Sequence, residues 1–168
     1  MSLTLEPVTP KLGARALGLR VADATDDDIT KLRAAMNTYK VLFLPDQRLN
    51  PEEHLRFAKR FGEIDVAAFG PKHADCPEMT VLDQEAPKGE GADAWHTDNT
   101  YVKCPPSYTI LQSVMLPPLG GDTCFADMYA AWNLLSPVLS NTSHYPDVEP
   151  DHLDGDKRYA RILVHLEK

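Results

Sequence analysis

One short segment, Trp95 to Tyr101, holds the side chains with the clearest potential for chemistry. His96 and Asp98 stand two positions apart within it. Residues i and i+2 of a strand point to the same side, so a strand here would present an imidazole beside a carboxylate. These are two of the three protein ligands of a 2-His-1-carboxylate site, which binds Fe(II) and leaves coordination positions open. Taken alone, this spacing is a weak signal, because most such pairs lie on the surface or are satisfied within the fold; it makes His96 and Asp98 candidate ligands of a non-haem iron site.

A third ligand would have to come from another part of the chain. The other histidines are His54, His73, His144, His152 and His165. His54 falls on a predicted helix with its side chain expected toward solvent, and His165 falls in a predicted final strand. His144 is the best candidate because it precedes a basic segment, residues 157–161. An iron site with a dicarboxylate co-substrate needs a cation, and the planar guanidinium of arginine binds a carboxylate through two hydrogen bonds.

Helices that could position these residues are predicted mainly in the first part of the chain. The first follows the acidic residues 26–28, which suit the positive end of a helix dipole, and it carries an apolar stripe of Ile29, Leu32 and Met36. The second begins at Asn50, with proline and glutamate at the first and third helical positions. Its apolar side is expected to consist of Leu55, Ala58 and Phe61. A third helix is predicted over residues 129–135.

The remaining ordered segments favour short strands. Strands are predicted within 2–9, 12–21, 40–45, 78–83, 107–115, 123–128 and 158–166. Because no crossover helices are expected between them, we predict antiparallel pairing. The pattern indicates a mainly β fold with flanking α-helices, as in a sandwich or barrel.

Length, charge and cysteine content limit the class of protein. A chain of 168 residues predicts a single domain, 1–168. The net charge of −8 argues against a nucleic-acid or membrane-surface binder. The cysteines, Cys76, Cys104 and Cys124, form no paired motif and are expected to be free thiols in a reducing cytosol. The first residues lack a signal-peptide pattern. We expect a cytoplasmic protein that binds a small molecule, and neither nucleic acid nor a membrane.

Several segments resemble, in order, the motifs of one enzyme family. They are residues 12–19, 41–47 (VLFLPDQ), 57–63 (FAKRFGE), 95–98 (WHTD), 118–123 (PLGGDT) and 128–132 (MYAAW). The chain is thereby similar to the taurine dioxygenase/chlorophenoxyacetate dioxygenase family of Fe(II)/2-oxoglutarate-dependent oxygenases. The resemblance implies a double-stranded β-helix, or jelly-roll, with helices packed outside.

The resemblance also implies roles for individual residues. His96 and Asp98 would bind iron, and His144, in a distal His-Tyr pair, would be the third ligand. Thr123 would hydrogen-bond the distal carboxylate of 2-oxoglutarate. Arg158 or Arg161 would bind the same carboxylate, with Arg158 preferred. The candidates for a substrate pocket are Asn99, for which a turn role is equally open, and Tyr101, which could simply be a core or wall aromatic.

The implied reaction consumes O₂, converts 2-oxoglutarate to succinate and CO₂, and hydroxylates a small organic substrate, for which an acidic compound is expected. Two rivals remain open. One is a catalytically incompetent, truncated relative that acts as a binding or assembly protein. The other is a Zn²⁺-dependent hydrolase that uses His96 and Asp98.

One interval departs from the family pattern. Thr123 and His144 are only 21 positions apart, whereas the family has a far longer interval there. Either the chain joins two parts of a longer protein near residues 136–141, or the deletion is real and the jelly-roll is incomplete in this chain. We favour the join, because the tail resembles the C-terminal end of the family. A real deletion would expose sheet edges and favour pairing between chains, and we expect a homo-oligomer.

Overall fold

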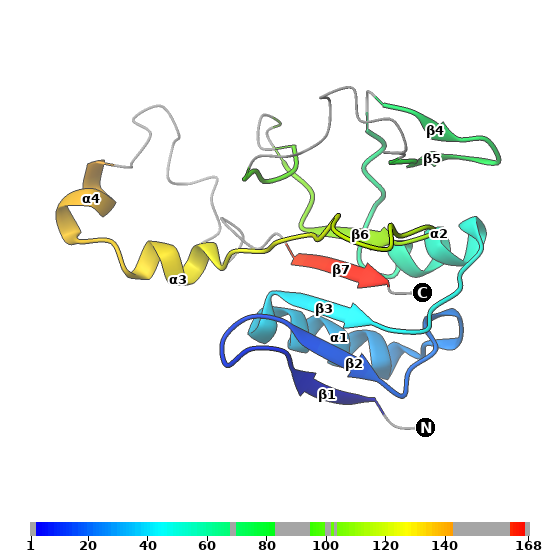
Figure 1. The fold of residues 1–168 in the computed structure, drawn as a ribbon, viewed down its shortest axis with the longest axis horizontal. Helices are drawn as coiled ribbons and strands as arrows, with labels where there is room; N and C mark the ends of the chain where they lie inside the picture. The colour runs from blue at the N-terminus through cyan, green and yellow to red at the C-terminus, as the bar shows by residue number, and fades with distance from the viewer. Residues whose placement is uncertain are drawn as a thin grey trace.

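The computed structural model describes residues 3–67, 70–82, 95–99, 102, 104–142 and 162–166. A central sheet, a small hairpin and helices make up this part of the chain (Figure 1). In chain order the elements are β1 (Thr4–Pro7), β2 (Ala14–Leu17), the 3-10 turn η1 (Val21–Asp23), α1 (Asp26–Tyr39), β3 (Val41–Leu44), α2 (Pro51–Lys59), β4 (Lys72–His73), β5 (Cys76–Thr80), β6 (Tyr108–Gln112), α3 (Met128–Asn133), α4 (Pro137–Thr142) and β7 (Ile162–Leu166).

The central sheet has the strand order β1-β2-β3-β7-β6. Only β1 and β2 pair antiparallel; the pairs β2–β3, β3–β7 and β7–β6 are all parallel. The expectation of antiparallel pairing was therefore wrong for most of this sheet. For β2 and β3 the reason is α1, which lies between them in the chain and provides the crossover that a parallel pair requires. The described strands thus form a mixed sheet, with the β4–β5 hairpin as a second, two-stranded sheet.

Helix α1 begins as the sequence predicts and covers one face of the sheet (Figure 1). Thr25 caps it: its side chain accepts a hydrogen bond from the Asp28 amide, and the Asp28 carboxylate accepts one from the Thr25 amide. This reciprocal pair satisfies two amides that would otherwise lack partners at the helix start. The predicted apolar stripe is confirmed, because Ile29, Leu32 and Met36 are all buried.

Helix α2 begins at the predicted place, but its buried side differs from the prediction. Asn50 and Glu53 form a second capping box around Pro51. The buried residues on the helix are His54 and Phe57, and Phe61 follows just beyond it. Leu55 and Ala58 are only partly buried. The expectation that His54 faces solvent was wrong, because the helix is rotated so that the His54–Phe57 side meets the sheet.

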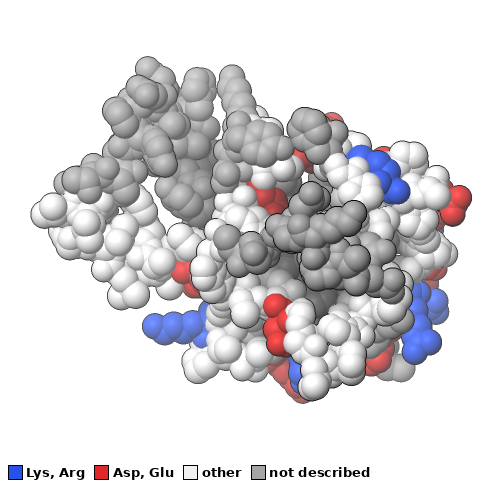
Figure 2. Space-filling model, turned by 45° about the horizontal axis from the view of Figure 1, so that its top comes forward, with Lys and Arg blue, Asp and Glu red and all other residues white. Residues whose placement is uncertain are grey.

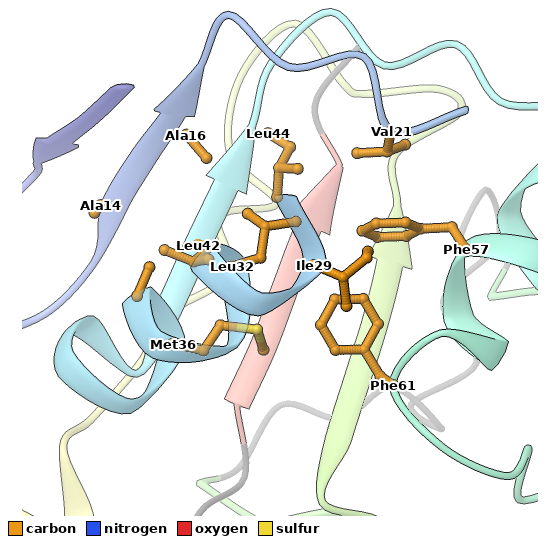
Figure 3. Packing of buried hydrophobic residues seen from close by; sticks show 11 residues of the cluster. Ala14, Ala16, Val21, Ile29, Leu32, Met36, Leu42, Leu44, Phe57 and Phe61 are labelled. Atoms are coloured by element: carbon orange, nitrogen blue, oxygen red, sulfur yellow. The ribbon is translucent and has the colours of Figure 1, made fainter. Parts of the chain in front are cut away.

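The hydrophobic core lies between the helices and one face of the sheet (Figure 3). Its largest fully buried side chains are Leu32, Met36, Leu42 and Leu44. Burying such a side chain stabilises the fold by about 1.5–3 kcal/mol. Tyr108 and Ile110 of β6 pack against the same cluster. The helix-facing side of the sheet is therefore filled, and side chains on alternate strand positions must point to the other face.

Three further local differences separate the prediction from the structure. No strand forms over residues 123–127, and α3 begins at Met128. The short strand β4 and helix α4 were not predicted. Helix α4 lies across the interval proposed for a join, whose existence stays a prediction. Helices α3 and α4 extend away from the sheet (Figure 1).

Candidate metal centre

The segment that carries His96 and Asp98 is attached to the sheet face opposite the helices. Tyr108 and Ile110 point into the core, so Thr109 between them points to the other face. The Thr109 hydroxyl donates a hydrogen bond of 2.9 Å to Asp98 Oδ2. This hydrogen bond holds Asp98 over the face of the sheet that points away from the helix-side core, which we call the open face. Asp98 lies eleven residues before Thr109 in the chain.

His96 and Asp98 lie side by side, as the spacing predicted. The distance from His96 Nε2 to Asp98 Oδ1 is 3.3 Å, and the two side chains are 51% and 42% exposed. They do not lie on a paired strand: residues 95–97 have no regular structure, and Asp98 and Asn99 form a turn. A polar contact this exposed contributes little to stability. The arrangement therefore leaves both groups accessible to a ligand from solution.

Asn99 anchors the far side of the same turn. Its backbone has a φ of 49°, a left-handed conformation that asparagine tolerates better than most residues. The Asn99 carbonyl accepts a hydrogen bond of 3.2 Å from the Val102 amide. The Asn99 amide Nδ2 donates to Asp65 Oδ2 at 3.1 Å. The structure thus gives Asn99 a turn-forming and tethering role, and its predicted substrate role stays a prediction.

The His96–Asp98 pair fits two adjacent ligands of one divalent ion. Metal–nitrogen and metal–oxygen bonds of about 2.1 Å at a right angle place two donor atoms about 3.0 Å apart. The observed 3.3 Å between Nε2 and Oδ1 needs a change of only a few tenths of an ångström. Within the described residues, no group of three His, Cys, Asp or Glu side chains converges on one point. The third ligand proposed from the sequence, His144, lies outside the described residues, as do Tyr101, Arg158 and Arg161.

Two of the other histidines, His54 and His73, make contacts within the fold that explain their presence without a metal ion. His54 is 8% exposed, and its burial lowers the pKa of the imidazole, opposed by a hydrogen bond to the backbone of Ile110. His73 lies in β4 and accepts a hydrogen bond at Nδ1 from the Asp75 amide at 3.2 Å. His165 belongs to β7, where its backbone is registered with Phe43 and Leu111. His152 lies outside the described residues.

Thr123 lies on a segment that crosses the open face. Phe125, two residues later, packs edge-to-face on Phe43 with ring centroids 6.1 Å apart. Phe43 points away from the helix-side core, since its neighbours Leu42 and Leu44 belong to the core cluster. Thr123 itself is exposed. Its predicted contact with 2-oxoglutarate stays a prediction, supported so far by its place on the same face as Asp98.

Sequence reasoning missed two residues of this site, Thr109 and Asp65. Thr109 could have been found, because it is the one short hydroxyl side chain inside the strand YTILQ and alternates with core-facing Tyr108 and Ile110. Asp65 carries no such signal. Its pairing with Asn99 spans 34 positions and depends on where the segment after α2 runs.

Other surface features of the described residues do not indicate a second candidate site. Two hollows in the described part of the chain, of about 360 and 280 Å³, are lined by residues of β1, β2 and α1 and include neither His96 nor Asp98. On the face shown in Figure 2, the described Lys and Arg side chains stand in small separate groups among acidic ones. All three cysteines are free, and burial raises the pKa of the Cys76 thiol. No helix among the described residues combines the length and apolar character needed to cross a membrane.

Comparison with known proteins identifies the family. Residues 4–141 match the description "Taurine catabolism dioxygenase TauD, TfdA family". The chain belongs to this family. The matched range includes His96, Asp98, Thr123 and the helices of the core.

Two curated relatives show the range of reactions in the family. An (S)-phenoxypropionate/alpha-ketoglutarate-dioxygenase of Sphingobium herbicidovorans is 33% identical over 139 residues, which cover 80% of this chain and 48% of the relative. An alpha-ketoglutarate-dependent sulfate ester dioxygenase of Pseudomonas putida is 31% identical over 186 aligned positions, covering 98% of this chain and 60% of the relative. The chain spans about half the length of the curated relatives it matches.

A solved structure supports the same relationship. The crystal structure of a taurine dioxygenase from Burkholderia xenovorans matches with a TM-score of 0.65 at 27% sequence identity. The match covers 84% of this chain and 51% of that one. The described architecture is therefore part of the fold of this family, whose jelly-roll was predicted from the sequence. The domain boundaries and the suggested join are left as predictions.

Proposed function

We propose that this chain provides the iron site of an Fe(II)- and 2-oxoglutarate-dependent dioxygenase that hydroxylates a small organic acid. The observation that carries the proposal is the 3.3 Å contact between His96 Nε2 and Asp98 Oδ1 on the open face of the sheet. Two accessible donors, one nitrogen and one oxygen, suit Fe(II) in a 2-His-1-carboxylate site. Relatives that act on phenoxypropionate and on sulfate esters support an anionic substrate.

Each residue has a defined task in this proposal. His96 and Asp98 bind iron, and His144 completes the triad. Thr123 and Arg158 hold the distal carboxylate of 2-oxoglutarate, with Arg161 as the alternative cation. When bound, the iron would supply the oxidation: one oxygen atom of O₂ enters succinate as CO₂ leaves 2-oxoglutarate, and the other enters a C–H bond of the substrate. The protein's own contribution is to orient these groups and to exclude water from the substrate.

The test of this function is formation of succinate. Purified protein with Fe(II), O₂ and 2-oxoglutarate is offered phenoxyalkanoates, alkyl sulfates and sulfonates, and succinate is measured. We expect succinate that depends on substrate, O₂ and Fe(II), and its loss in His96→Ala and Asp98→Ala. A reaction that proceeds equally well without O₂ and 2-oxoglutarate would contradict the proposal and favour the Zn²⁺-dependent hydrolase.

The third ligand can be tested separately. We expect His144→Ala to abolish Fe(II)-dependent succinate formation, while His152→Ala, a matched histidine in the same acidic tail, retains it. If His144→Ala remains active, another histidine completes the triad, and the proposed role of His144 is wrong. The same design applied to Arg158→Lys and Arg161→Lys identifies the co-substrate arginine, because lysine cannot form the two parallel hydrogen bonds of arginine.

A second candidate function is a binding or assembly protein without catalysis. It is favoured by large apolar side chains that the described part of the chain leaves exposed on residues 114–139, including Met115, Leu119, Leu134 and Val138. Together these side chains would provide an apolar interaction surface of the kind that binds another protein. We propose on the same grounds that copies of the chain associate with one another. A sedimentation experiment that finds only monomers over a wide concentration range would contradict this association.

A further inference from the structure

We propose that Thr109 is a positioning residue that commits Asp98 to binding iron through one oxygen only. This inference rests on the proposed iron site and adds a residue outside the metal motif. Thr109 lies on β6, whereas the motif lies in an irregular segment and a turn before it.

The two oxygens of Asp98 have different partners. Oδ2 accepts the 2.9 Å hydrogen bond from Thr109 Oγ1, and Oδ1 faces His96 Nε2 at 3.3 Å. A metal ion held by His96 would therefore meet Oδ1, while Oδ2 is already engaged by a hydroxyl donor. Ligation through one oxygen keeps three coordination positions open, which a chelating co-substrate and O₂ require. Ligation through both oxygens would occupy one of them.

Threonine on a strand is well suited to hold a carboxylate in place. Branching at Cβ restricts its side-chain rotation, and backbone pairing with β7 fixes the position of Thr109 opposite Leu163. A hydroxyl that donates to an ionised carboxylate makes one of the stronger hydrogen bonds in proteins. Asp98, by contrast, sits in a turn and is 42% exposed. Thr109 on β6 thus fixes the orientation of the Asp98 carboxylate, which the turn alone would not maintain.

A second hydrogen bond, between Asn99 and Asp65, should hold the turn in place when Thr109 is substituted. That bond tethers the same turn to the segment after α2 and does not involve Thr109. The turn should therefore persist when the hydroxyl is removed, so that a change in metal binding reports the orientation of Asp98. Thr109→Val keeps the branched shape and removes only the donor, whereas Thr109→Ser keeps the donor.

The first experiment measures metal affinity under anaerobic conditions. Partners that orient a metal ligand typically change affinity by about 10-fold or more when removed. We expect Thr109→Val to bind Fe(II) about tenfold more weakly, Thr109→Ser to stay close to the unmodified protein, and the control Thr80→Val on β5 to have no effect. The visible spectrum of the Co(II)-substituted protein should change in Thr109→Val and be restored in Thr109→Ser. Equal affinities and spectra in the unmodified and valine proteins would overturn the inference.

A second experiment needs no metal. Thermal unfolding of metal-free Thr109→Val, Asp98→Ala and the double variant should give non-additive shifts, because both single variants remove the same hydrogen bond. Additive shifts would overturn the contact itself. The two proposals fail differently: an unmodified protein that binds no Fe(II) would overturn the iron site, whereas normal Fe(II) binding by Thr109→Val would overturn only the role of Thr109.

Discussion

At the scale of residues, the site depends on a few polar contacts that orient otherwise exposed side chains. His96 and Asp98 are about half exposed and gain little stability from each other. Their arrangement is held from outside by Thr109 and, through Asn99, by Asp65. Exposure keeps both ligands accessible, and the hydrogen bonds limit the conformations that they can adopt. This combination is suited to residues that bind a metal ion from solution rather than to residues that stabilise the fold.

The tether at Asn99 leads to a prediction about metal binding. Asn99→Gly preserves the left-handed backbone, because glycine adopts a positive φ readily, but loses the hydrogen bond to Asp65. Asp65→Ala loses the same bond from the other side. We expect both variants to bind Fe(II) several-fold more weakly, by the same mechanism that applies to other partners of metal ligands. Calorimetric titration under anaerobic conditions measures this, and unchanged affinity in both variants would contradict a tethering role.

His54 leads to a prediction about pH. Burial lowers the pKa of His54 in the folded protein below its ordinary value of 6.5, so the unfolded chain binds more protons as the solution is acidified. Stability therefore falls as pH drops through about 6.5. We expect the melting temperature to fall more between pH 7.5 and pH 5.5 in the unmodified protein than in His54→Gln, which does not titrate. Parallel pH profiles for the two proteins would show that His54 does not contribute.

At the scale of elements, neighbouring residues specify where α1 and α2 begin, whereas most strand pairings in the central sheet depend on residues far apart in the chain. Asn50, Pro51 and Glu53 lie within four positions, and together they specify the start of α2 from sequence alone. The direction of pairing between β3 and β7 depends on segments more than a hundred positions apart in the chain. Local signals therefore predicted where α1 and α2 begin, whereas strand direction, which depends on long-range contacts, was predicted wrongly for most of the central sheet.

The cap of α2 can be tested on its own. Loss of a helix cap of this type costs about 1 kcal/mol, and α2 carries the buried His54 and Phe57. We expect Asn50→Ala to lower the free energy of unfolding in urea by about 1 kcal/mol. The matched control, Asn37→Ala, replaces an exposed asparagine within α1 and should leave stability nearly unchanged. Equal effects of the two substitutions would contradict the capping role of Asn50.

At the scale of the whole molecule, one packed layer of helices covers one face of the sheet, and the site occupies the other. The sequence pattern predicted the buried side of α1 and the proximity of His96 to Asp98, because both depend on short spacings, Ile29–Leu32–Met36 and His96–Asp98. It did not reveal that β6 brings Thr109 to Asp98, or that α2 turns His54 inward. Those contacts arise only when the sheet and helices assemble, so no short spacing encodes them.

The difference in burial between the helix–sheet core and the segment after β6 leads to a prediction about stability. Leu32 is 1% exposed in the helix–sheet core, whereas Leu119 is 89% exposed. At protein concentrations too low for copies of the chain to associate, we expect Leu32→Ala to lower the free energy of unfolding by about 2–5 kcal/mol and Leu119→Ala to change it by less than about 0.5 kcal/mol. Chemical denaturation of both variants measures this difference. A large loss in Leu119→Ala under these conditions would contradict the exposure of Leu119 in the single chain, whereas a loss that appears only at high protein concentration would support association between copies.

The most direct test of the iron site is an anaerobic titration of the purified protein with Fe(II) and 2-oxoglutarate, monitored by visible absorption. Chelation of iron by 2-oxoglutarate in the site should produce a weak metal-to-ligand charge-transfer band. We predict that this band forms in the unmodified protein and in His73→Ala, and that it is absent in His96→Ala. A folded, unmodified protein that gives no band would contradict the iron site and favour the non-catalytic binding protein.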